Sequence, residues 1–340
     1  MKVSILVPVY GVEKYIERCA RSLFEQTYSE IEYVFIDDCS PDHSIEVLRS
    51  VMKEYPNREK NVRIIKHKDN RGLAAARNTA VANCRSEFLF HIDSDDFLEL
   101  EAIEKLVEQQ KKGDFDIVTG NLIFLYPDSK KKLRNRESTN KQEIILDYIR
   151  PHYSHVLCGR LIRKSLYTDN NIFAAEGYNI GEDHQVTPRL FYYANSFSSI
   201  DDCIYNYDCT NVNSYTGQST DAKKFAKKVL QDIMAFEILR KFFETKPERI
   251  YIDSVNNRMA RYIYYHAPIL ADLQQKEDFY AAWQFFNAIK KDERGEMPGC
   301  SDSFYLYLMR NYTLCKLCRR YKLDLLYSKI FGRLKNKVSR

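Results

Sequence analysis

The chain has 340 residues, of which 29% are charged and 44% hydrophobic, a composition typical of globular proteins with one large domain or two ordinary ones. Its nine cysteines are scattered and odd in number, which argues against a disulfide framework. Only a short apolar run precedes Pro8, and no stretch approaches the roughly 18 apolar residues of a membrane span. We therefore expect a cytoplasmic protein without a signal peptide.

Positive charge is concentrated in residues 303–340, which contain ten Lys and Arg but a single acid, Asp324, whereas the whole chain has a formal net charge of +5. Leucines interleaved with these cations are typical of helices that lie on anionic membranes. The same pattern fits a helical cap that packs on the rest of the protein. Both interpretations stay open, and the first would place the protein peripherally at the inner face of the membrane. Nucleic-acid binding is the weakest alternative, and we expect none.

Apolar and amphipathic segments alternate over the first 126 residues. Continuous apolar runs predict buried strands, at residues 3–8, 32–36, 62–66, 87–92 and 115–126. Apolar residues at helical spacing predict helices between them, at residues 12–27, 45–55, 73–84 and 99–112. This alternation predicts an α/β fold with a mainly parallel central sheet covered on both faces.

The rest of the chain is less regular and then becomes helical. We expect a polar surface loop at 128–141, a short amphipathic segment at 154–167, a helix at 181–194 and a strand pair at 197–207. Helical spacing resumes after residue 220, at 225–243, 249–266, 278–290 and, with breaks, 302–337. The predicted domains are therefore a catalytic domain at 1–215 and an all-helical C-terminal extension at 220–340.

Three carboxylates, Asp93, Asp95 and Asp96, directly follow the predicted strand at 87–92. Like charges so close repel one another unless a cation lies among them. A hard divalent metal that binds oxygen ligands and accompanies a phosphorylated substrate fits this cluster, and a solvated acidic loop is the alternative. Polar residues also follow three other strands, at 8–10, 37–38 and 67–72. Because ligands of such sheets bind beyond the carboxyl ends of the strands, this convergence favours a binding site.

Two common phosphate-binding loops are absent from the sequence. No Gly-x-Gly-x-x-Gly follows the first strand, and no Gly-Lys-Ser/Thr occurs. This argues against a dehydrogenase and a P-loop NTPase.

Five motifs resemble those of family 2 glycosyltransferases, in the order and approximate spacing of that family. They are residues 3–10, 36–40, 70–78, 93–96 and 181–183. The resemblance covers about residues 3–215 and implies a GT-A fold, a nucleotide-sugar donor that is usually a UDP-sugar, a Mn²⁺ or Mg²⁺ ion, and inversion at the anomeric carbon.

The resemblance also implies roles for individual residues. Asp38, or alternatively Asp37, would accept the uracil imide hydrogen. Asp93 and Asp95 match the DxD motif at the ribose and the metal, and Asp96 is an equally suitable metal ligand. Asp183 matches the catalytic base, with Glu182 as the alternative. The other positions implied to bind the donor are Pro8, Val9, Tyr10, Asn70, Arg71, Gly72, Arg77 and Ser94.

The chain departs from the family at three places, one of which is Gly11, where the family often has Asn. Tyr207-Asp208 stands where the family commonly has Tyr-Arg, so that an arginine for the diphosphate is not evident; Arg189, Lys223 and Lys224 are candidates to replace it. Cys158-Gly159-Arg160 stands where acceptor contacts are common, which puts those contacts in doubt.

The sequence therefore predicts an inverting, metal-dependent glycosyltransferase that moves a sugar onto a glycan or lipid-linked acceptor in polysaccharide biosynthesis. Two alternatives remain: a sugar nucleotidyltransferase, which would need a Gly-rich opening loop that is missing, and a non-catalytic regulatory protein that binds nucleotide sugars. The sugar, the acceptor, the linkage and the oligomeric state are not determined by the sequence.

Overall fold

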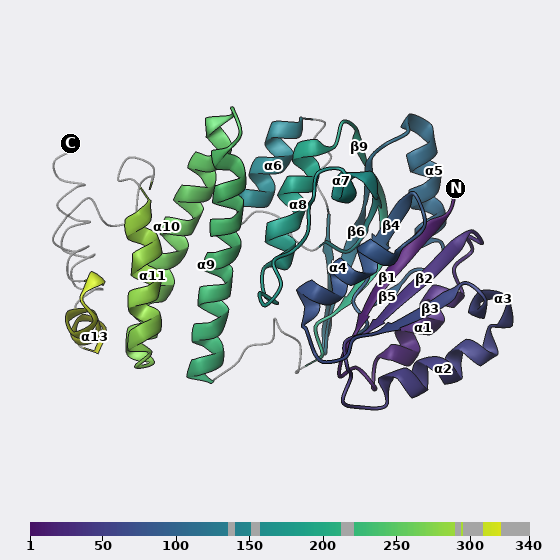
Figure 1. Cartoon of the computed structure of the whole chain (residues 1–340), viewed down its shortest axis with the longest axis horizontal. Coiled ribbons are helices and arrows are strands. Elements are labelled where there is room, and N and C mark those ends of the chain that lie inside the picture. The colour runs from purple at the N-terminus through teal and green to yellow at the C-terminus, as the bar shows by residue number, and fades with distance from the viewer. Residues whose placement is uncertain (135–139, 151–156, 212–220, 290–293, 295–308, 321–340) are drawn as a thin grey trace. The chain divides into compact units, whose positions relative to one another are not determined.

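The computed structural model describes residues 1–134, 140–150, 157–211, 221–289, 294 and 309–320, with only the backbone given at 317–320. The chain divides into two compact units, Met1–Gly217 and Gln218–Arg340 (Figure 1). The first unit is built on one sheet, and the second consists of helices in its described part.

The sheet of the first unit has nine strands among the described residues. They are β1 (Val3–Val9), β2 (Ile31–Asp37), β3 (Val62–Lys66), β4 (Phe88–His91), β5 (Phe97–Leu98), β6 (Ile117–Tyr126), β7 (Ser129–Leu133), β8 (Arg160–Arg163) and β9 (Phe197–Asp208). Their order is β3-β2-β1-β4-β8-β6-β9-β5, with β7 paired to β6. The four strands from β3 to β4 are parallel, as predicted.

Antiparallel pairs begin beyond β4, so that the sheet is mixed rather than mainly parallel. Strand β8 runs antiparallel to both of its neighbours, β4 and β6, and β5 runs antiparallel to β9. Strands β6 and β9 are again parallel, with a bulge near Asn121. The parallel half therefore ends where β8 enters the sheet, beside the strand that carries the acidic motif.

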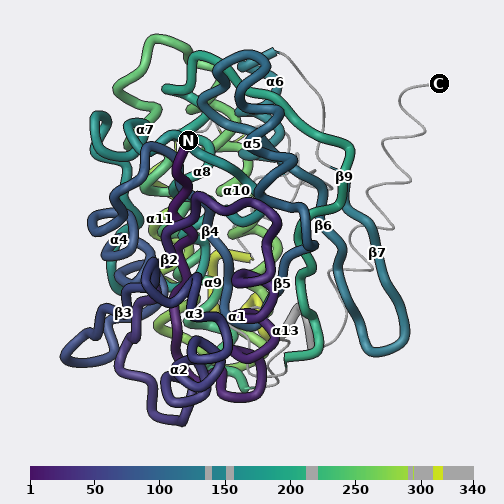
Figure 2. The backbone as a smooth tube through the Cα atoms, turned by 90° about the vertical axis from the view of Figure 1, so that its right-hand side faces the viewer, coloured from purple at the N-terminus to yellow at the C-terminus, as the bar shows by residue number. Residues whose placement is uncertain are grey.

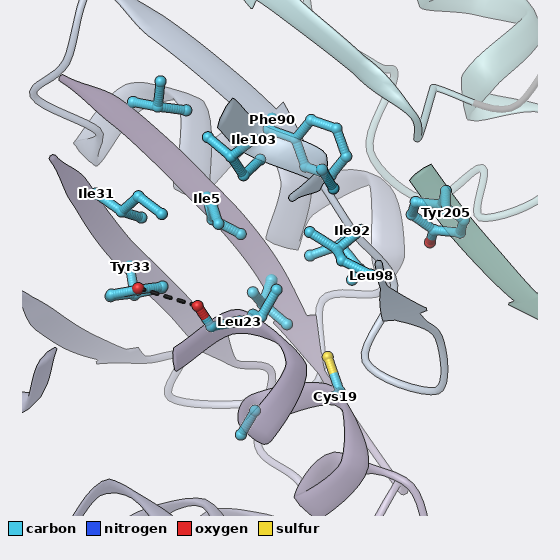
Figure 3. Packing of buried hydrophobic residues seen from close by; sticks show 14 of the residues in the cluster. Ile5, Cys19, Leu23, Ile31, Tyr33, Phe90, Ile92, Leu98, Ile103 and Tyr205 are labelled. Atoms are coloured by element: carbon cyan, nitrogen blue, oxygen red, sulfur yellow. Dashed lines mark hydrogen bonds between the residues drawn. The ribbon is translucent and has the colours of Figure 1, made fainter. Parts of the chain in front are cut away.

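Eight helices accompany the sheet in the described part of the first unit. They are α1 (Ile16–Phe24), α2 (Ser44–Glu54), α3 (Pro56–Glu59), α4 (Leu73–Asn83), α5 (Ala102–Gly113), α6 (Lys141–Ile149), α7 (Ser165–Thr168) and α8 (Glu182–Tyr193). The main hydrophobic core lies between one face of the sheet and helices α1, α2 and α5, and includes Ile5, Leu23, Tyr33, Phe90 and Ile103 (Figure 3).

Helix α4 packs on β1 and β2 through an alanine-rich stretch. Its buried residues include Ala74, Ala75, Ala76 and Ala80, whose small side chains allow a close approach to the strands. Arg77 of the same helix forms an ion pair with Asp93, which follows strand β4.

Several expectations for the middle of the chain are corrected. The predicted loop at 128–141 contains strand β7, because the backbone of the lysine-rich stretch pairs with β6 and overrides its poor strand propensity. Figure 2 shows this hairpin projecting from the sheet. The predicted strand pair at 197–207 is a single strand, β9, since β6 and β5 offer pairing partners along its length. Helix α6 and the short strands β5 and β8 were not expected.

The second unit contains four helices among the described residues: α9 (Ala222–Glu244), α10 (Arg249–Asp272), α11 (Lys276–Ala288) and α13 (Tyr312–Arg320). Helix α10 contacts the other three. Most of the basic stretch at 303–340 lies outside the described residues, so that neither interpretation of it is tested. Within the described part, no helix combines the length and the apolar character that a membrane span requires.

Candidate functional site

The acidic motif forms a tight turn between β4 and β5. The N–H of Asp96 donates to the carbonyl of Asp93 at 3.1 Å, which closes the turn. Asp96 is 2% exposed, and its two carboxylate oxygens accept from the Tyr205 hydroxyl at 2.5 Å and the Asp208 N–H at 2.8 Å. The Tyr205 hydroxyl in turn accepts from the Asp93 N–H at 3.1 Å. Asp96 thus fastens the turn to strand β9.

Asp93 and Asp95 keep part of their surface exposed. Asp93 Oδ1 accepts from Arg77 Nη2 at 2.8 Å, and Asp95 Oδ2 accepts from Asn211 Nδ2 at 2.8 Å. Burial, followed by the charge of Asp93, raises the pKa of the Asp95 carboxyl. Among the described residues, no group of three or more His, Cys, Asp or Glu side chains forms a ready-made metal site. The two accessible carboxylates nevertheless suit an ion such as Mg²⁺, which takes one or two protein carboxylates and completes its shell with phosphate oxygens and water.

Arg77 connects the acidic turn to the second acidic motif. Its side chain is 4% exposed, and its Nε lies 3.4 Å from Glu182 Oε1 while its Nη2 binds Asp93. Burial opposes the charge of the guanidinium, yet Asp93, Asp183 and Glu182 together raise the pKa of Arg77. The positive charge is therefore held among the carboxylates of both motifs.

Asp183 lies in the first turn of helix α8, directly after Glu182. Burial is the main cause that raises the pKa of Asp183 to about 6. Its Oδ1 atom is buried and has no hydrogen-bond partner in the part of the chain that the structure describes. Burial and the neighbouring charge of Asp183 also raise the pKa of Glu182 well above its usual value. A carboxylate with a pKa near 6 and an unused oxygen is suited to accept a proton at neutral pH.

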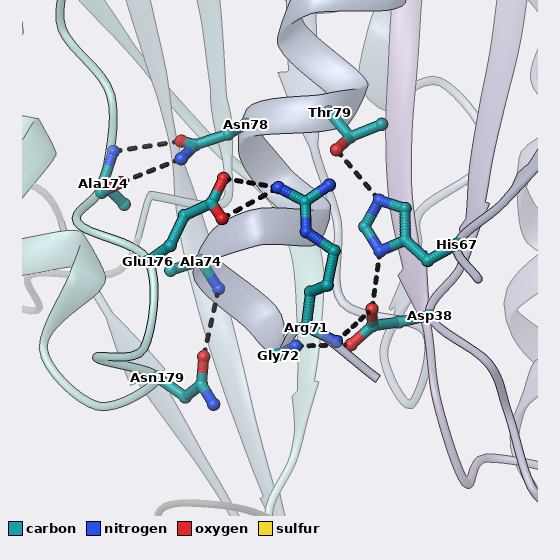
Figure 4. Close-up of polar contacts among 10 residues, drawn as sticks. All are labelled: Asp38, His67, Arg71, Gly72, Ala74, Asn78, Thr79, Ala174, Glu176 and Asn179. Carbon is teal, nitrogen blue, oxygen red and sulfur yellow. Dashed lines mark hydrogen bonds and ion pairs between the residues drawn. The ribbon is translucent and has the colours of Figure 1, made fainter. Parts of the chain in front are cut away.

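The two aspartates at the end of β2 have different surroundings. Asp38 is 2% exposed; its Oδ1 accepts from the Arg71 N–H at 2.9 Å and contacts the His67 ring at 2.6 Å, while its Oδ2 accepts from the Gly72 N–H at 2.7 Å (Figure 4). Asp37 accepts from the Ser40 N–H at 2.9 Å, and its second oxygen lies 3.7 Å from Lys66 Nζ. Asp38 is therefore fully engaged inside the protein, whereas Asp37 retains an oxygen with only a distant partner.

The loop before helix α4 is tied to the segment that leads into α8. Nη2 of Arg71 donates to both carboxylate oxygens of Glu176 at 2.8 Å, and Asn78 exchanges two hydrogen bonds with the backbone of Ala174 (Figure 4). Gly72 has φ +88°, and a Cβ at this position would lie 2.3 Å from the side-chain amide of Asn179. These contacts therefore connect the loop at 70–72 and the start of helix α4 to the segment that precedes Asp183 in the chain.

The remaining residues predicted to bind the donor lie around the same rim. Val9 and Pro8 are buried at the end of β1, and Tyr10 beyond them is 44% exposed. Ser94 is 6% exposed within the acidic turn, and Asn70 is exposed. Among the described residues, no hydrogen bond or ion pair links Tyr10 or Asn70 to the acidic turn, so their assignment stays a prediction.

Three side chains at the site were missed by the sequence reasoning. Arg18 of α1 binds Asp208 Oδ2 at 2.5 Å and the carbonyl of Asp95 at 2.8 Å; Tyr205 and Asn211 hold the acidic turn as described above. No local pattern marks them, because each reaches the turn from a distant part of the chain. The departure at Asp208 was the one available signal, since an acid at that position attracts a cation.

The structure argues against Arg189 as the side chain that binds a diphosphate. It is 9% exposed, and its guanidinium donates to the carbonyls of Gln185 and Phe173. The guanidinium of Arg189 is therefore occupied by backbone carbonyls inside the protein. Lys223 and Lys224 lie in the helical unit, whose placement relative to the first unit is not determined.

Comparison with known protein families gives a match over the first half of the chain. Residues 4–169 match the sequence model of glycosyl transferase family 2. Among curated relatives, EpsJ of Bacillus subtilis (strain 168), named an uncharacterized glycosyltransferase, is 28% identical over 233 residues, which cover 63% of this chain and 62% of EpsJ. The chain thus matches less than two thirds of the length of this relative.

Two solved structures share the fold. The crystal structure of Staphylococcus aureus TarS (residues 1–349) with UDP has a TM-score of 0.54 at 20% identity, covering 86% of this chain and 89% of that one. The mannosyltransferase PcManGT of Pyrobaculum calidifontis, with GDP-Man and Mn²⁺, has a TM-score of 0.53 at 14% identity, covering 97% and 86%. The likeness to TarS confirms the predicted GT-A fold with a helical C-terminal region.

Proposed function

This chain belongs to glycosyl transferase family 2, and from that premise we propose that it transfers a sugar from a nucleotide donor, with UDP as the nucleotide, to a glycan or lipid-linked acceptor in polysaccharide synthesis. The observation that carries the proposal is the meeting of the two acidic motifs at Arg77. One motif offers carboxylates for a metal-bound diphosphate, and the other offers a carboxylate with a raised pKa for the acceptor.

The donor end of the site is assigned to the acidic turn and the strand ends beside it. TarS has been crystallised with UDP and with UDP-GlcNAc, which supports a uridine nucleotide for this chain. Because Asp38 already accepts three contacts from the protein, we assign the imide of the base to Asp37, with Tyr10 available to cover the base.

The divalent ion is assigned to Asp95 together with Asp93. Both oxygens of Asp96 are engaged by Tyr205 and Asp208, which leaves this carboxylate a supporting role. The bound ion in PcManGT is Mn²⁺, and the oxygen ligands available here suit Mn²⁺ or Mg²⁺. An ion held there would neutralise the negative charge that develops on the departing diphosphate.

Asp183 is assigned the role of the base. Its carboxylate would take the proton of the acceptor hydroxyl as that oxygen attacks the anomeric carbon, opposite the departing nucleotide, so that the configuration inverts. The charge of Arg77 lowers the pKa of Asp183 against the larger effect of burial, so that Asp183 can ionise close to neutral pH.

The test is a panel of nucleotide sugars assayed for metal-dependent donor hydrolysis and for transfer. We expect one UDP-sugar to be hydrolysed slowly in the presence of Mn²⁺ and to be protected by EDTA. Binding of UDP without any turnover would favour the regulatory alternative, and formation of a nucleotide sugar from a sugar phosphate and UTP would favour the nucleotidyltransferase.

Two parts of the proposal concern the whole chain. We assign catalysis to the sheet-containing unit and a supporting role to the helical unit, in keeping with the predicted domains at 1–215 and 220–340. We also propose peripheral membrane contact through residues 303–340. Its test is binding to anionic liposomes before and after removal of this stretch, and equal binding would contradict it.

A further inference from the structure

His67 is a buried polar side chain for which the motifs of the sequence provide no role. It follows strand β3, is 6% exposed, and both of its ring nitrogens have a partner. Nδ1 lies 2.6 Å from Asp38 Oδ1, and Nε2 lies 2.9 Å from Thr79 Oγ1 of helix α4 (Figure 4). A side chain that serves only to fill space would not need two partners from two different elements.

The proton positions follow from the contacts of Asp38. A carboxylate only accepts hydrogen bonds, and Asp38 already accepts from the N–H groups of Arg71 and Gly72. The hydrogen between Asp38 and His67 therefore belongs to Nδ1 of the ring. In the neutral ring Nε2 is then the acceptor, so that the Thr79 hydroxyl donates to it. This tautomer is assigned from the hydrogen-bond network.

These contacts form a continuous hydrogen-bond network that holds the loop at residues 70–72. The network runs from Thr79 in helix α4 to His67, from His67 to Asp38, and from Asp38 to the backbone of Arg71 and Gly72, where α4 begins. Gly72 holds a left-handed φ of +88° at this point. The loop cannot change its backbone conformation without breaking the hydrogen bonds to Asp38.

We propose that His67 is a positioning residue for the nucleotide donor. It holds the Asp38 carboxylate in place, and Asp38 fixes the backbone of residues 70–72 in the conformation that receives the nucleoside end of the donor. Thr79 supports this arrangement by orienting the ring. The identity of the ligand rests on the function proposed above, whereas the effect on the loop follows from the contacts themselves.

Three substitutions separate the contacts. His67→Leu removes both, His67→Asn retains an amide N–H near the position of Nδ1, and Thr79→Val removes only the outer hydroxyl. His43→Asn, at an exposed position before helix α2, is the matched control. Two measurements are made on the full chain: hydrogen exchange of the Arg71 and Gly72 amides without ligand, and affinity for UDP with Mn²⁺ in the buffer.

We expect His67→Leu to increase exchange at these two amides and to weaken UDP binding by about tenfold, the order of magnitude for a buried hydrogen bond left without its partner. His67→Asn should recover part of both effects, and Thr79→Val should show a smaller change in the same direction. In donor titrations of turnover, KM should rise more than kcat falls. Exchange in strand β4 should stay at the wild-type level, which separates a local effect from general unfolding.

Wild-type exchange at Arg71 and Gly72 together with wild-type UDP affinity in Thr79→Val and His67→Leu would overturn the inference. If His67→Leu does not fold, Thr79→Val and His67→Asn decide the question. If the wild-type protein itself does not bind UDP or any other nucleotide, the proposed function and the donor role of His67 both fail. Faster exchange in His67→Leu would then still establish the effect on the loop.

Discussion

Arg77 Nη2 and Asp93 Oδ1 lie 2.8 Å apart, in an ion pair whose arginine side chain is 4% exposed. The same guanidinium reaches Glu182, which lies 89 residues beyond Asp93 in the sequence. Among the described residues, these carboxylates compensate a cation that is removed from water, and its charge in turn compensates theirs. The pair therefore makes the two acidic motifs interdependent.

Replacing Arg77 should destabilise the protein strongly. Arg77→Met leaves buried carboxylates without their cation, which costs about 3–5 kcal/mol of the free energy of unfolding. Arg71→Met is the matched control, because its ion pair with Glu176 is exposed on both sides and contributes less than about 1 kcal/mol. Urea denaturation measures both values, and equal losses would contradict the role assigned to Arg77.

Asp183→Asn should abolish transfer while leaving donor and metal binding nearly intact. An amide cannot accept the acceptor's proton, and the loss of a general base reduces turnover by about 10²–10⁴-fold. Transfer assays at saturating donor, together with UDP titrations, measure the two effects. Turnover at the wild-type rate in this variant would exclude Asp183 from the mechanism.

The same residue predicts the direction of the pH dependence. Burial raises the pKa of Asp183 to about 6, and a base acts only when it is deprotonated. We therefore expect kcat/KM to rise with pH through about 6 and to level off above it. If kcat/KM falls with rising pH over this range, the catalytic group acts as an acid and the assignment is wrong.

Asp95 and Asp96 should respond differently to substitution by alanine. Asp96→Ala removes the acceptor of the Tyr205 hydroxyl and the Asp208 N–H, and it should lower the free energy of unfolding by ~1–3 kcal/mol. Asp95→Ala should change stability less but should abolish the response of activity to Mn²⁺. Thermal denaturation and Mn²⁺ titrations of donor hydrolysis distinguish the two, and the reverse pattern would assign the metal to Asp96.

Gly11 and Gly72 both have a positive φ, and alanine substitutions at the two positions test how closely Gly72 packs against its neighbours. Gly11→Ala, where no atom lies within 4 Å of the added Cβ, should cost about 1 kcal/mol for the backbone conformation alone. Gly72→Ala should cost more, because its Cβ displaces the Asn179 side chain. Adding Asn179→Ala should recover part of the extra cost of Gly72→Ala, as measured by denaturation; the rest should remain because the backbone of Gly72, at φ 88° and ψ 170°, suits glycine alone. A double variant no more stable than Gly72→Ala would rule out this contact as the cause.

The sequence by itself determined the local features of the chain. Continuous apolar runs indicated the buried strands, and apolar residues at helical spacing indicated the helices. The carboxylate cluster directly after an apolar strand is also visible without tertiary information. The parallel half of the sheet, the acidic turn at Asp93–Asp96, the helix that begins at Glu182 and the helical second region were predicted on this basis. The resemblance to family 2 glycosyltransferases followed from the order of the five motifs.

The tertiary structure alone decided which of these residues contact one another. The insertion of β8 beside β4, the fastening of Asp96 by Tyr205, the engagement of Asp38 with His67 and the link from Arg77 to both acidic motifs join residues far apart in the chain. Such contacts have no period in the sequence, because they depend on the packing of whole elements. Their physical basis is burial, since a charge or a hydrogen-bonding group removed from water must find its partner wherever the fold provides one.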